Sequence, residues 1–276
     1  MSQMSPTTTE RVARRVRHET RRRLLQVRDV SRVTPKMLRI VVEGDELEGF
    51  VSAAHDDHVK LFFPQPGQEK PVLPTPSPNG LVYPEGALKP AARDYTPRRY
   101  DAVAKTLAID FVLHGDGPAA AWAAQARPGQ FLGVGGPRGS FIVPDDFDWY
   151  LLAGDETALP AIGRRLEELP AGTRALVVVE VADAGEEQYF DTRARFETHW
   201  LHRDGGAPGD RSLLPAAIAG LKLPPGDGYA WVAAEAATAK ALRRHLVEER
   251  GLKKDRVKAA AYWKRGAVAV HETYDD

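Results

Sequence analysis

The stretch Asp148-Trp149-Tyr150-Leu151-Leu152-Ala153-Gly154 marks a change in the pattern of the sequence. From here to the C-terminus, short apolar segments alternate with segments of helical periodicity. Strands that alternate with helices form a parallel sheet covered on both faces. We therefore expect an α/β domain over 147–276. Its expected strands are 149–153, 174–181, 199–202, 229–233 and 257–263, and its expected helices are 157–168, 213–219 and 236–250.

The part that precedes this stretch has a different sequence pattern, which predicts many short strands and a single helix at 118–125. The expected strands are 24–33, 37–42, 59–63, 93–100, 106–113 and the pair within 131–143. Such a series favours a closed antiparallel β-barrel, here over 24–146. Residues 64–90 carry eight prolines, which do not fit inside a sheet, so they predict a long surface loop.

Residues 1–23 form a basic N-terminal arm, with seven arginines between positions 11 and 23. A nucleic-acid-binding arm is one interpretation. No aromatic residue accompanies the arginines, so we favour a solvated or partly disordered leader and expect no nucleic-acid partner.

The composition limits the chemistry. The chain of 276 residues has zero formal net charge and no cysteine, which excludes disulfides and thiolate-held iron–sulfur clusters. Electrons would therefore travel on an organic cofactor. No apolar run is long enough to cross a bilayer and no secretory signal is visible, so we expect a cytoplasmic protein without membrane insertion.

Motifs of other enzyme classes are missing. The sequence has no Gly-x-Ser-x-Gly elbow, no phosphate loop and no His-Glu-x-x-His, so hydrolases and kinases have no support. His55 and His58, which flank Asp56 and Asp57, could form a metal cluster. A solvated polar loop is the favoured interpretation, and we expect no metal site.

The segment Arg93-Asp94-Tyr95-Thr96 brings together a cation, an aromatic ring and a hydroxyl. This set suits a flavin nucleotide: Tyr95 would lie against the isoalloxazine ring, Thr96 would hydrogen-bond its edge and Arg93 would neutralise a phosphate. An ordinary exposed strand is the alternative.

The helix that opens at Gly117-Pro118-Ala119 offers free N–H groups to a pyrophosphate. Trp122 on this helix either stacks on the adenine or belongs to the core. Residues 133–139 have spaced glycines, but no helix follows them, so they predict a tight barrel turn near the cofactor, from which Arg138 projects.

In the α/β domain, Gly154 ends the first parallel strand, where ligands of open sheets bind. Thr157 can cap the next helix, and Asp155 and Glu156 fit the nicotinamide and ribose end of a dinucleotide or a purely structural cap. Glu180 closes the next strand and could bind a ribose 2′-hydroxyl, which favours NADH slightly. Arg203 and Arg211 could instead meet a phosphate, so NADPH stays open.

Taken in order, these segments resemble the siderophore-interacting protein family, the flavin-dependent ferric-siderophore reductases. The resemblance runs from about Val27 to Gly266 and rests on four motifs, which are 93–96, 114–123, 136–141 and 152–160. It implies a ferredoxin-reductase-like fold, bound FAD, NADH or NADPH as the donor and a ferric siderophore as the acceptor. Hydride would pass from the nicotinamide to FAD and single electrons to Fe(III), with no obligatory catalytic acid or base.

The resemblance also implies a basic pocket for an anionic siderophore of catecholate or mixed type. Its positions correspond here to Lys60, Arg138, Lys264 and Arg265. His114 would lie beside the flavin, and Trp263 would border it. We expect a monomer. The alternatives are a general NAD(P)H flavin oxidoreductase with another acceptor and a siderophore-binding module without redox chemistry.

Overall fold

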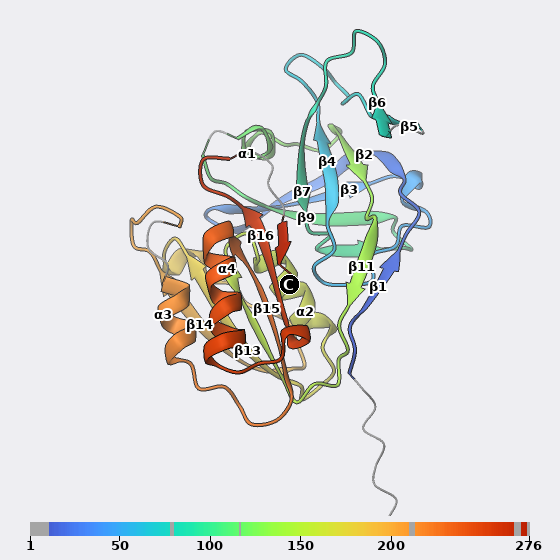
Figure 1. The fold of residues 1–276 in the computed structure, drawn as a ribbon. Helices are drawn as coiled ribbons and strands as arrows, with labels where there is room; N and C mark the ends of the chain where they lie inside the picture. The colour runs from blue at the N-terminus through green and yellow to red at the C-terminus, as the bar shows by residue number, and fades with distance from the viewer. Residues whose placement is uncertain (1–10, 78–79, 116, 210–212, 268–271, 275–276) are drawn as a thin grey trace, which may run out of the picture.

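A computed structural model describes residues 11–77, 80–115, 117–209, 213–267 and 272–274. Two sheets lie side by side, an antiparallel one built from the first half of the chain and a largely parallel one built from the second (Figure 1). The expected combination of a β domain and an α/β domain is confirmed.

The first sheet has seven strands in the order β7-β4-β10-β2-β3-β9-β8, all antiparallel to their neighbours. The strands are β2 (Arg22–Thr34), β3 (Met37–Glu43), β4 (Val59–Phe63), β7 (Ala91–Tyr95), β8 (Arg99–Asp101), β9 (Thr106–Val112) and β10 (Phe131–Gly135), with a 3₁₀ turn at Asp45–Leu47. The sheet curls around an apolar core that helix α1 (Pro118–Ala124) also covers. Among the described strands β7 and β8 form the two ends of the ladder, so the sheet is a half-barrel and the expected closure was wrong.

The described part of the N-terminal arm is not a solvated leader. Arg14–Arg17 form strand β1, which pairs with β11 (Gly139–Ile142) in a separate two-stranded sheet beside the two main ones (Figure 1). Arg11 lies 3.3–3.7 Å from the carboxylates of Asp146, Asp148 and Asp227. Backbone pairing and ion pairs therefore fix this segment, which corrects the expectation; residues 1–10 lie outside the described ranges.

The proline-rich segment 64–90 is a long loop, as expected. It contains a small hairpin of β5 (Thr75–Ser77) and β6 (Gly80–Val82), which projects away from the α/β sheet (Figure 1).

The second sheet has the order β14-β13-β12-β15-β16-β17, in which β17 alone is antiparallel to its neighbour. The strands are β12 (Trp149–Asp155), β13 (Arg174–Val181), β14 (Arg195–His202), β15 (Gly228–Glu235), β16 (Val257–Trp263) and β17 (Glu272–Tyr274). The helices are α2 (Leu159–Glu168), α3 (Leu213–Gly220) and α4 (Ala236–Arg244), which continues as a π-helical segment over His245–Glu249, and short 3₁₀ turns lie at Ala184–Glu186 and Lys254–Arg256.

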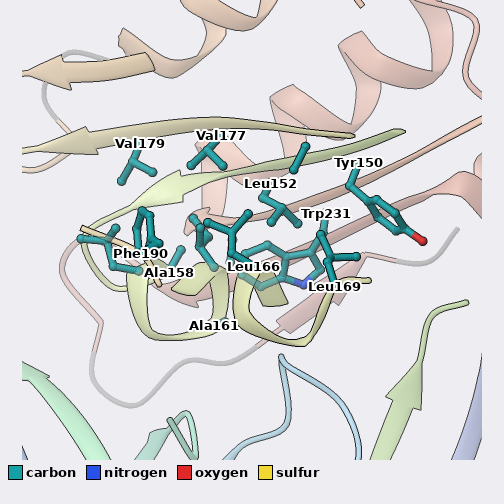
Figure 2. Close-up of a cluster of buried hydrophobic side chains, with 14 of the residues drawn as sticks. Tyr150, Leu152, Ala158, Ala161, Leu166, Leu169, Val177, Val179, Phe190 and Trp231 are labelled. Atoms are coloured by element: carbon teal, nitrogen blue, oxygen red, sulfur yellow. The ribbon is translucent and has the colours of Figure 1, made fainter. Parts of the chain in front are cut away.

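The central strands of this sheet are buried on both faces, which explains their uninterrupted apolar sequence. One face packs against α2 and the other against α3 and α4. Figure 2 shows the α2 side, where Leu152, Val177 and Val179 lie over Ala161 and Leu166. Both layers of the predicted α/β architecture are present.

Residues 55–57 bind the two halves together and are not a solvated loop. Asp56 is 9 % exposed, and its carboxylate accepts hydrogen bonds from Trp231 Nε1 at 3.2 Å on β15 and from Lys258 Nζ at 2.6 Å on β16. His55 packs edge-on against Trp231, and burial lowers its pKa to about 3. Buried charge of this kind requires a partner across the interface, and the sequence pattern carries no sign of that partner.

Helix α2 contributes a second set of contacts across the interface. Arg164 donates to Ser52 Oγ at 2.7 Å and to the Pro97 carbonyl at 3.0 Å. Arg98 pairs with Glu167. The half-barrel and the α/β sheet are thus joined by several buried, directional contacts.

Over the ranges that the structure describes, no helix combines the length and apolar character needed to cross a membrane.

Replacement of Lys258 by Met should leave the Asp56 carboxylate buried without its countercharge. We expect the free energy of unfolding to fall by about 3–5 kcal/mol, measured by urea denaturation at pH 7. The double variant Asp56→Asn/Lys258→Met removes both charges and should recover much of the loss. Equal stability of Lys258→Met and wild-type protein would contradict a role for this ion pair in joining the two sheets.

Candidate active site

A cavity of about 330 Å³ lies between the two halves, a volume in the range of ligand pockets. The first half contributes His58, Arg93, Asp94, Tyr95, Thr96, Asp110, Val112, His114 and 117–120, and the second contributes Thr157, Pro160, Tyr262, Trp263, Lys264 and Ala267. The cavity therefore joins the edge of the half-barrel to the carboxyl ends of the parallel strands, where ligands of open α/β sheets bind.

The predicted flavin motif lies in this cavity. Arg93, Tyr95 and Thr96 are at the end of edge strand β7, and all three line the wall. The Tyr95 ring packs 4.5 Å from the Phe111 ring, and burial raises the pKa of its phenol. Tyr95 is thus held as a flat, neutral wall. Thr96 is buried, and its side chain hydrogen-bonds the Tyr262 phenol of the other half.

The start of α1 also faces the cavity. Gly117 occupies the N-cap position without a side-chain cap, and no atom lies within 4 Å of the place that a Cβ would take. Pro118 and Ala119 line the cavity, and so does His114 at the end of the preceding segment. These small residues leave open space in front of the helix for a bulky group.

Trp122 does not line this cavity, and its position favours the second of its two alternatives, a place in the core. Its side chain is 7 % exposed and packs 5.5 Å from Phe63 and 5.9 Å from Phe111 in the half-barrel core. The reason is helical periodicity: with Ala119 and Ala123 it forms the i, i+3, i+4 face of α1 that covers the sheet.

On the α/β side, the turn after β12 is organised by Asp155. Its carboxylate accepts hydrogen bonds from the Thr157 backbone N at 2.9 Å, the Thr157 hydroxyl at 2.5 Å and Trp263 Nε1 at 2.7 Å. Thr157 does not cap α2, since the helix begins at Leu159 with Ala158 at the N-cap position. Thr157 and Trp263 line the cavity, whereas Asp155 lies behind them.

Burial raises the pKa of Asp155 to about 6, and the negative charge of neighbouring Glu156 acts in the same direction. Hydrogen bonds from Thr157 and Trp263 oppose this shift. The carboxyl group consequently titrates near neutrality, where an exposed aspartate is fully ionised.

Glu156 and Glu180 are not lining residues. Both form ion pairs with the buried Arg203 guanidinium. Glu156 accepts two hydrogen bonds, from Arg203 Nη1 at 2.8 Å and Nη2 at 2.5 Å, and Glu180 Oε1 lies 3.5 Å from Arg203 Nη1. Glu180 also accepts from the Leu213 backbone N at 3.3 Å, and burial raises its pKa. Its carboxylate is thus engaged within the protein, which removes the basis for a preference for NADH.

Gly154 has a packing role. A Cβ at this position would lie 2.2 Å from the Ala233 carbonyl oxygen and 2.5 Å from the Ala158 Cβ. Only glycine lets β12, β15 and the start of α2 approach so closely.

The four predicted basic residues occupy different places. Lys264 lines the cavity. Lys60 on β4 pairs with the lining residue Asp94 at 2.7 Å. Arg138 is exposed in the turn between β10 and β11, and Arg265 lies beside Glu235 and Pro208, neither among the lining residues. The turn 133–139 also remains outside the lining set.

Several lining residues were absent from the predicted site, His58 and Tyr262 among them. His58 lies one residue before β4, and Tyr262 precedes Trp263 near the end of β16. Burial raises the pKa of the Tyr262 phenol. No group of three or more His, Asp or Glu side chains is placed to hold a metal ion anywhere in the described ranges.

The lining residues fit a flavin. An aromatic plane, a cation, a buried hydroxyl and an uncapped helix start converge on one open cavity, and its other wall lies at the strand ends that suit a nicotinamide. Arg211, a possible phosphate ligand, lies outside the described residues.

Comparison with known proteins agrees with this arrangement. The model of the siderophore-interacting FAD-binding domain matches residues 26–141, and that of the siderophore-interacting protein matches 147–266. The chain is 41% identical over 258 residues to the NADPH-dependent ferric-chelate reductase of Escherichia coli, covering 92% of this chain and 98% of the relative. It is 35% identical to the ferric vibriobactin reductase ViuB of Vibrio cholerae, covering 91% and 93%.

Among solved structures, a siderophore utilization protein from T. fusca superposes with a TM-score of 0.86 at 42% identity, covering 94% of this chain and 98% of that one. A ferredoxin reductase of carbazole 1,9a-dioxygenase shares the fold alone, with a TM-score of 0.63 at 15% identity, covering 86% and 68%. The fold is therefore ferredoxin-reductase-like, and the chain belongs to the siderophore-interacting protein family.

Proposed function

We propose that this protein is an NAD(P)H-dependent FAD enzyme that reduces ferric siderophores and so releases Fe(II). The observation that carries the proposal is the single cavity in which the flavin motif 93–96 faces the strand-end residues Thr157 and Trp263. The relatives named as a ferric-chelate reductase and a ferric vibriobactin reductase support the same activity.

Bound FAD supplies the ability to accept a hydride and to deliver electrons one at a time. The residues of this chain bind and orient. Tyr95 would provide a flat surface, Arg93 a countercharge for phosphate, and the backbone N–H groups of Gly117 and Ala119 at the uncapped start of α1 a place for the pyrophosphate. Val112 and Pro160 add apolar groups to the wall of the cavity.

Thr96 links cofactor binding to the arrangement of the two halves. Its hydroxyl would reach the flavin edge, yet its side chain also bonds Tyr262 of the α/β half. The hydroxyl is thereby fixed in one orientation. No side chain has to move a proton in this scheme, because weaker binding of Fe(II) by siderophores suffices for iron release.

Domain boundaries at 24–146 and 147–276 fit the division between the two sheets, and we propose them as the functional units. Lys264 lines the cavity as a cation that suits an anionic ferric siderophore of catecholate or mixed type, and Lys60 offsets the charge of the lining residue Asp94. NADH and NADPH both remain candidate donors, and the Escherichia coli relative is named for NADPH.

An anaerobic assay tests the activity directly. We expect the purified protein to show a flavin spectrum that bleaches on addition of NADPH or NADH. A ferric catecholate complex should then yield Fe(II), captured by ferrozine. Bleaching without Fe(II) would indicate another acceptor, and a protein without flavin would contradict the proposal.

Tyr95→Ala should lower the flavin content of the purified protein, because the ring wall against Phe111 is lost. Trp122→Phe is the matched control. It should retain flavin while the free energy of unfolding falls by about 1–3 kcal/mol, since a core aromatic shrinks. The absorbance ratio of flavin to protein measures occupancy, and urea unfolding measures stability. A loss of flavin in Trp122→Phe alone would reverse the two assignments.

Lys264→Ala should raise the apparent KM for a ferric catecholate about three- to tenfold at low ionic strength, with unchanged flavin content. Lys60→Ala should act in the same direction but more weakly, because Asp94 already neutralises part of its charge. Lys253→Ala, an exposed residue that precedes β16 at the opposite end of that strand, serves as the control. Equal KM values in the Lys264 and Lys253 variants would exclude the basic wall, and added salt should reduce the difference.

A further inference from the structure

The indole of Trp263 lies across the carboxyl end of the parallel sheet. Trp263 is the last residue of β16 and Asp155 is the last residue of β12, and β15 stands between these two strands. The 2.7 Å hydrogen bond from Trp263 Nε1 to Asp155 Oδ2 therefore spans the end of β15. This is the place at which open α/β sheets bind their ligands.

The opposite edge of the indole lies close to Gly209. A Cβ placed on Gly209, in the segment after β14, would lie 3.1 Å from Trp263 Cη2. The ring is half-buried and lines the flavin cavity on one side. Asp155 holds the ring at one edge, and Gly209 leaves little space at the other, so the hydrogen bond is the directional contact that fixes the orientation of the ring.

The two carboxylate oxygens of Asp155 have separate partners. Oδ1 accepts from the backbone N and the hydroxyl of Thr157 and so holds the turn after β12, whereas Oδ2 accepts from Trp263. Asp155 is 6 % exposed and does not line the cavity. Glu235, at the end of β15, is engaged elsewhere: it accepts from the N–H groups of Ala237 and Thr238 at the start of α4. Asp155 is thus the acid that faces the indole.

We propose that Asp155 is a positioning residue that holds the Trp263 ring over the carboxyl end of the sheet and thereby limits access of the nicotinamide donor to the flavin. The inference rests on the proposed function, since it assigns the donor side of the same cavity. Asp155 acts through Trp263 and does not itself touch the ligand.

The strength of this hold depends on pH. Burial raises the pKa of Asp155 to about 6, so above pH 6 the carboxylate is ionised and the bond is charge-assisted, and below pH 6 it is neutral and the bond is weaker. Ionisable groups on the surrounding elements are Glu156 after β12, Glu180 on β13, Arg203 after β14, Glu235 on β15, Tyr262 on β16, Lys264 after β16, and Asp56 and Asp57 before β4. The charges of Glu156 and Glu180 are already paired with Arg203.

Indole N–H resonances give a test that requires no turnover. The chain has five tryptophans, and Trp263→Phe identifies the resonance of Trp263 in the ¹H–¹⁵N spectrum of the protein as purified. We expect this resonance to shift with pH with a midpoint of about 6, as the pKa of Asp155 requires. In Asp155→Asn the titration should be absent. A resonance that does not titrate, or that titrates equally in Asp155→Asn, overturns the proposal.

Kinetics test the consequence for the donor. With ferricyanide as acceptor, the KM for NADPH or NADH at pH 7.5 should fall about fivefold in both Asp155→Asn and Trp263→Phe. In Asp155→Asn the hydrogen bond to the indole loses its charge, and in Trp263→Phe the bond is absent, so in both variants the aromatic ring moves aside for the donor more easily. Flavin content should be unchanged in Asp155→Asn, because Asp155 does not line the cavity. Trp200→Phe, on edge strand β14, removes an indole elsewhere and should alter neither the titration nor the KM.

A donor KM within twofold of the wild-type value in either Asp155→Asn or Trp263→Phe would overturn the inference. Ferricyanide separates this result from the proposed function, because a failure to reduce ferric siderophores leaves the donor reaction measurable.

Discussion

The buried contact of Asp56 with Lys258 and Trp231 is the constraint on which the site depends. It lies at the interface between an antiparallel half-barrel and a parallel sheet, neither of which contains the whole cavity. A carboxylate at this depth is tolerated only with its partners in place, so the contact specifies one relative position of the two halves. Arg164 and Arg98 add further directional bonds to the same interface.

With the halves fixed, the cavity acquires two chemically different walls. The half-barrel presents Arg93, Tyr95, Thr96 and the open start of α1, which together suit a flavin nucleotide. The α/β half presents Thr157, Tyr262, Trp263 and Lys264. Behind this wall, three acids that do not line the cavity, Asp155, Glu156 and Glu180, lie near one buried arginine, Arg203. Burial is the main cause that raises the pKa of Asp155 to about 6, and the negative charge of Glu156 adds to it.

Local pattern predicted the elements well where one physical requirement dominated. The continuous apolar run of β13 could only be a strand buried on both faces, and the prolines of 64–90 could only be a loop. The pattern was misleading where a polar residue had a partner far along the chain. Asp56 looked solvated because Lys258 is remote in sequence, and Glu180 looked available to a ribose because Arg203 pairs with it only in the fold. For Trp122 the pattern left adenine stacking and the core as alternatives, and in the fold its helical face packs into the core.

The sequence by itself determined the order of strands and helices, the change from a β to an α/β region near Asp148, the flavin motif 93–96 and the absence of cysteine chemistry. These depend on side-chain periodicity, proline and glycine placement and residue identity, all of which are local. Only the tertiary structure decided that β7 and β8 end an open half-barrel, that His58 and Tyr262 line the cavity, and that Trp263 reaches over β15 to Asp155. Those outcomes depend on the burial of charge and on contacts between strand ends, which arise only when distant segments pack together.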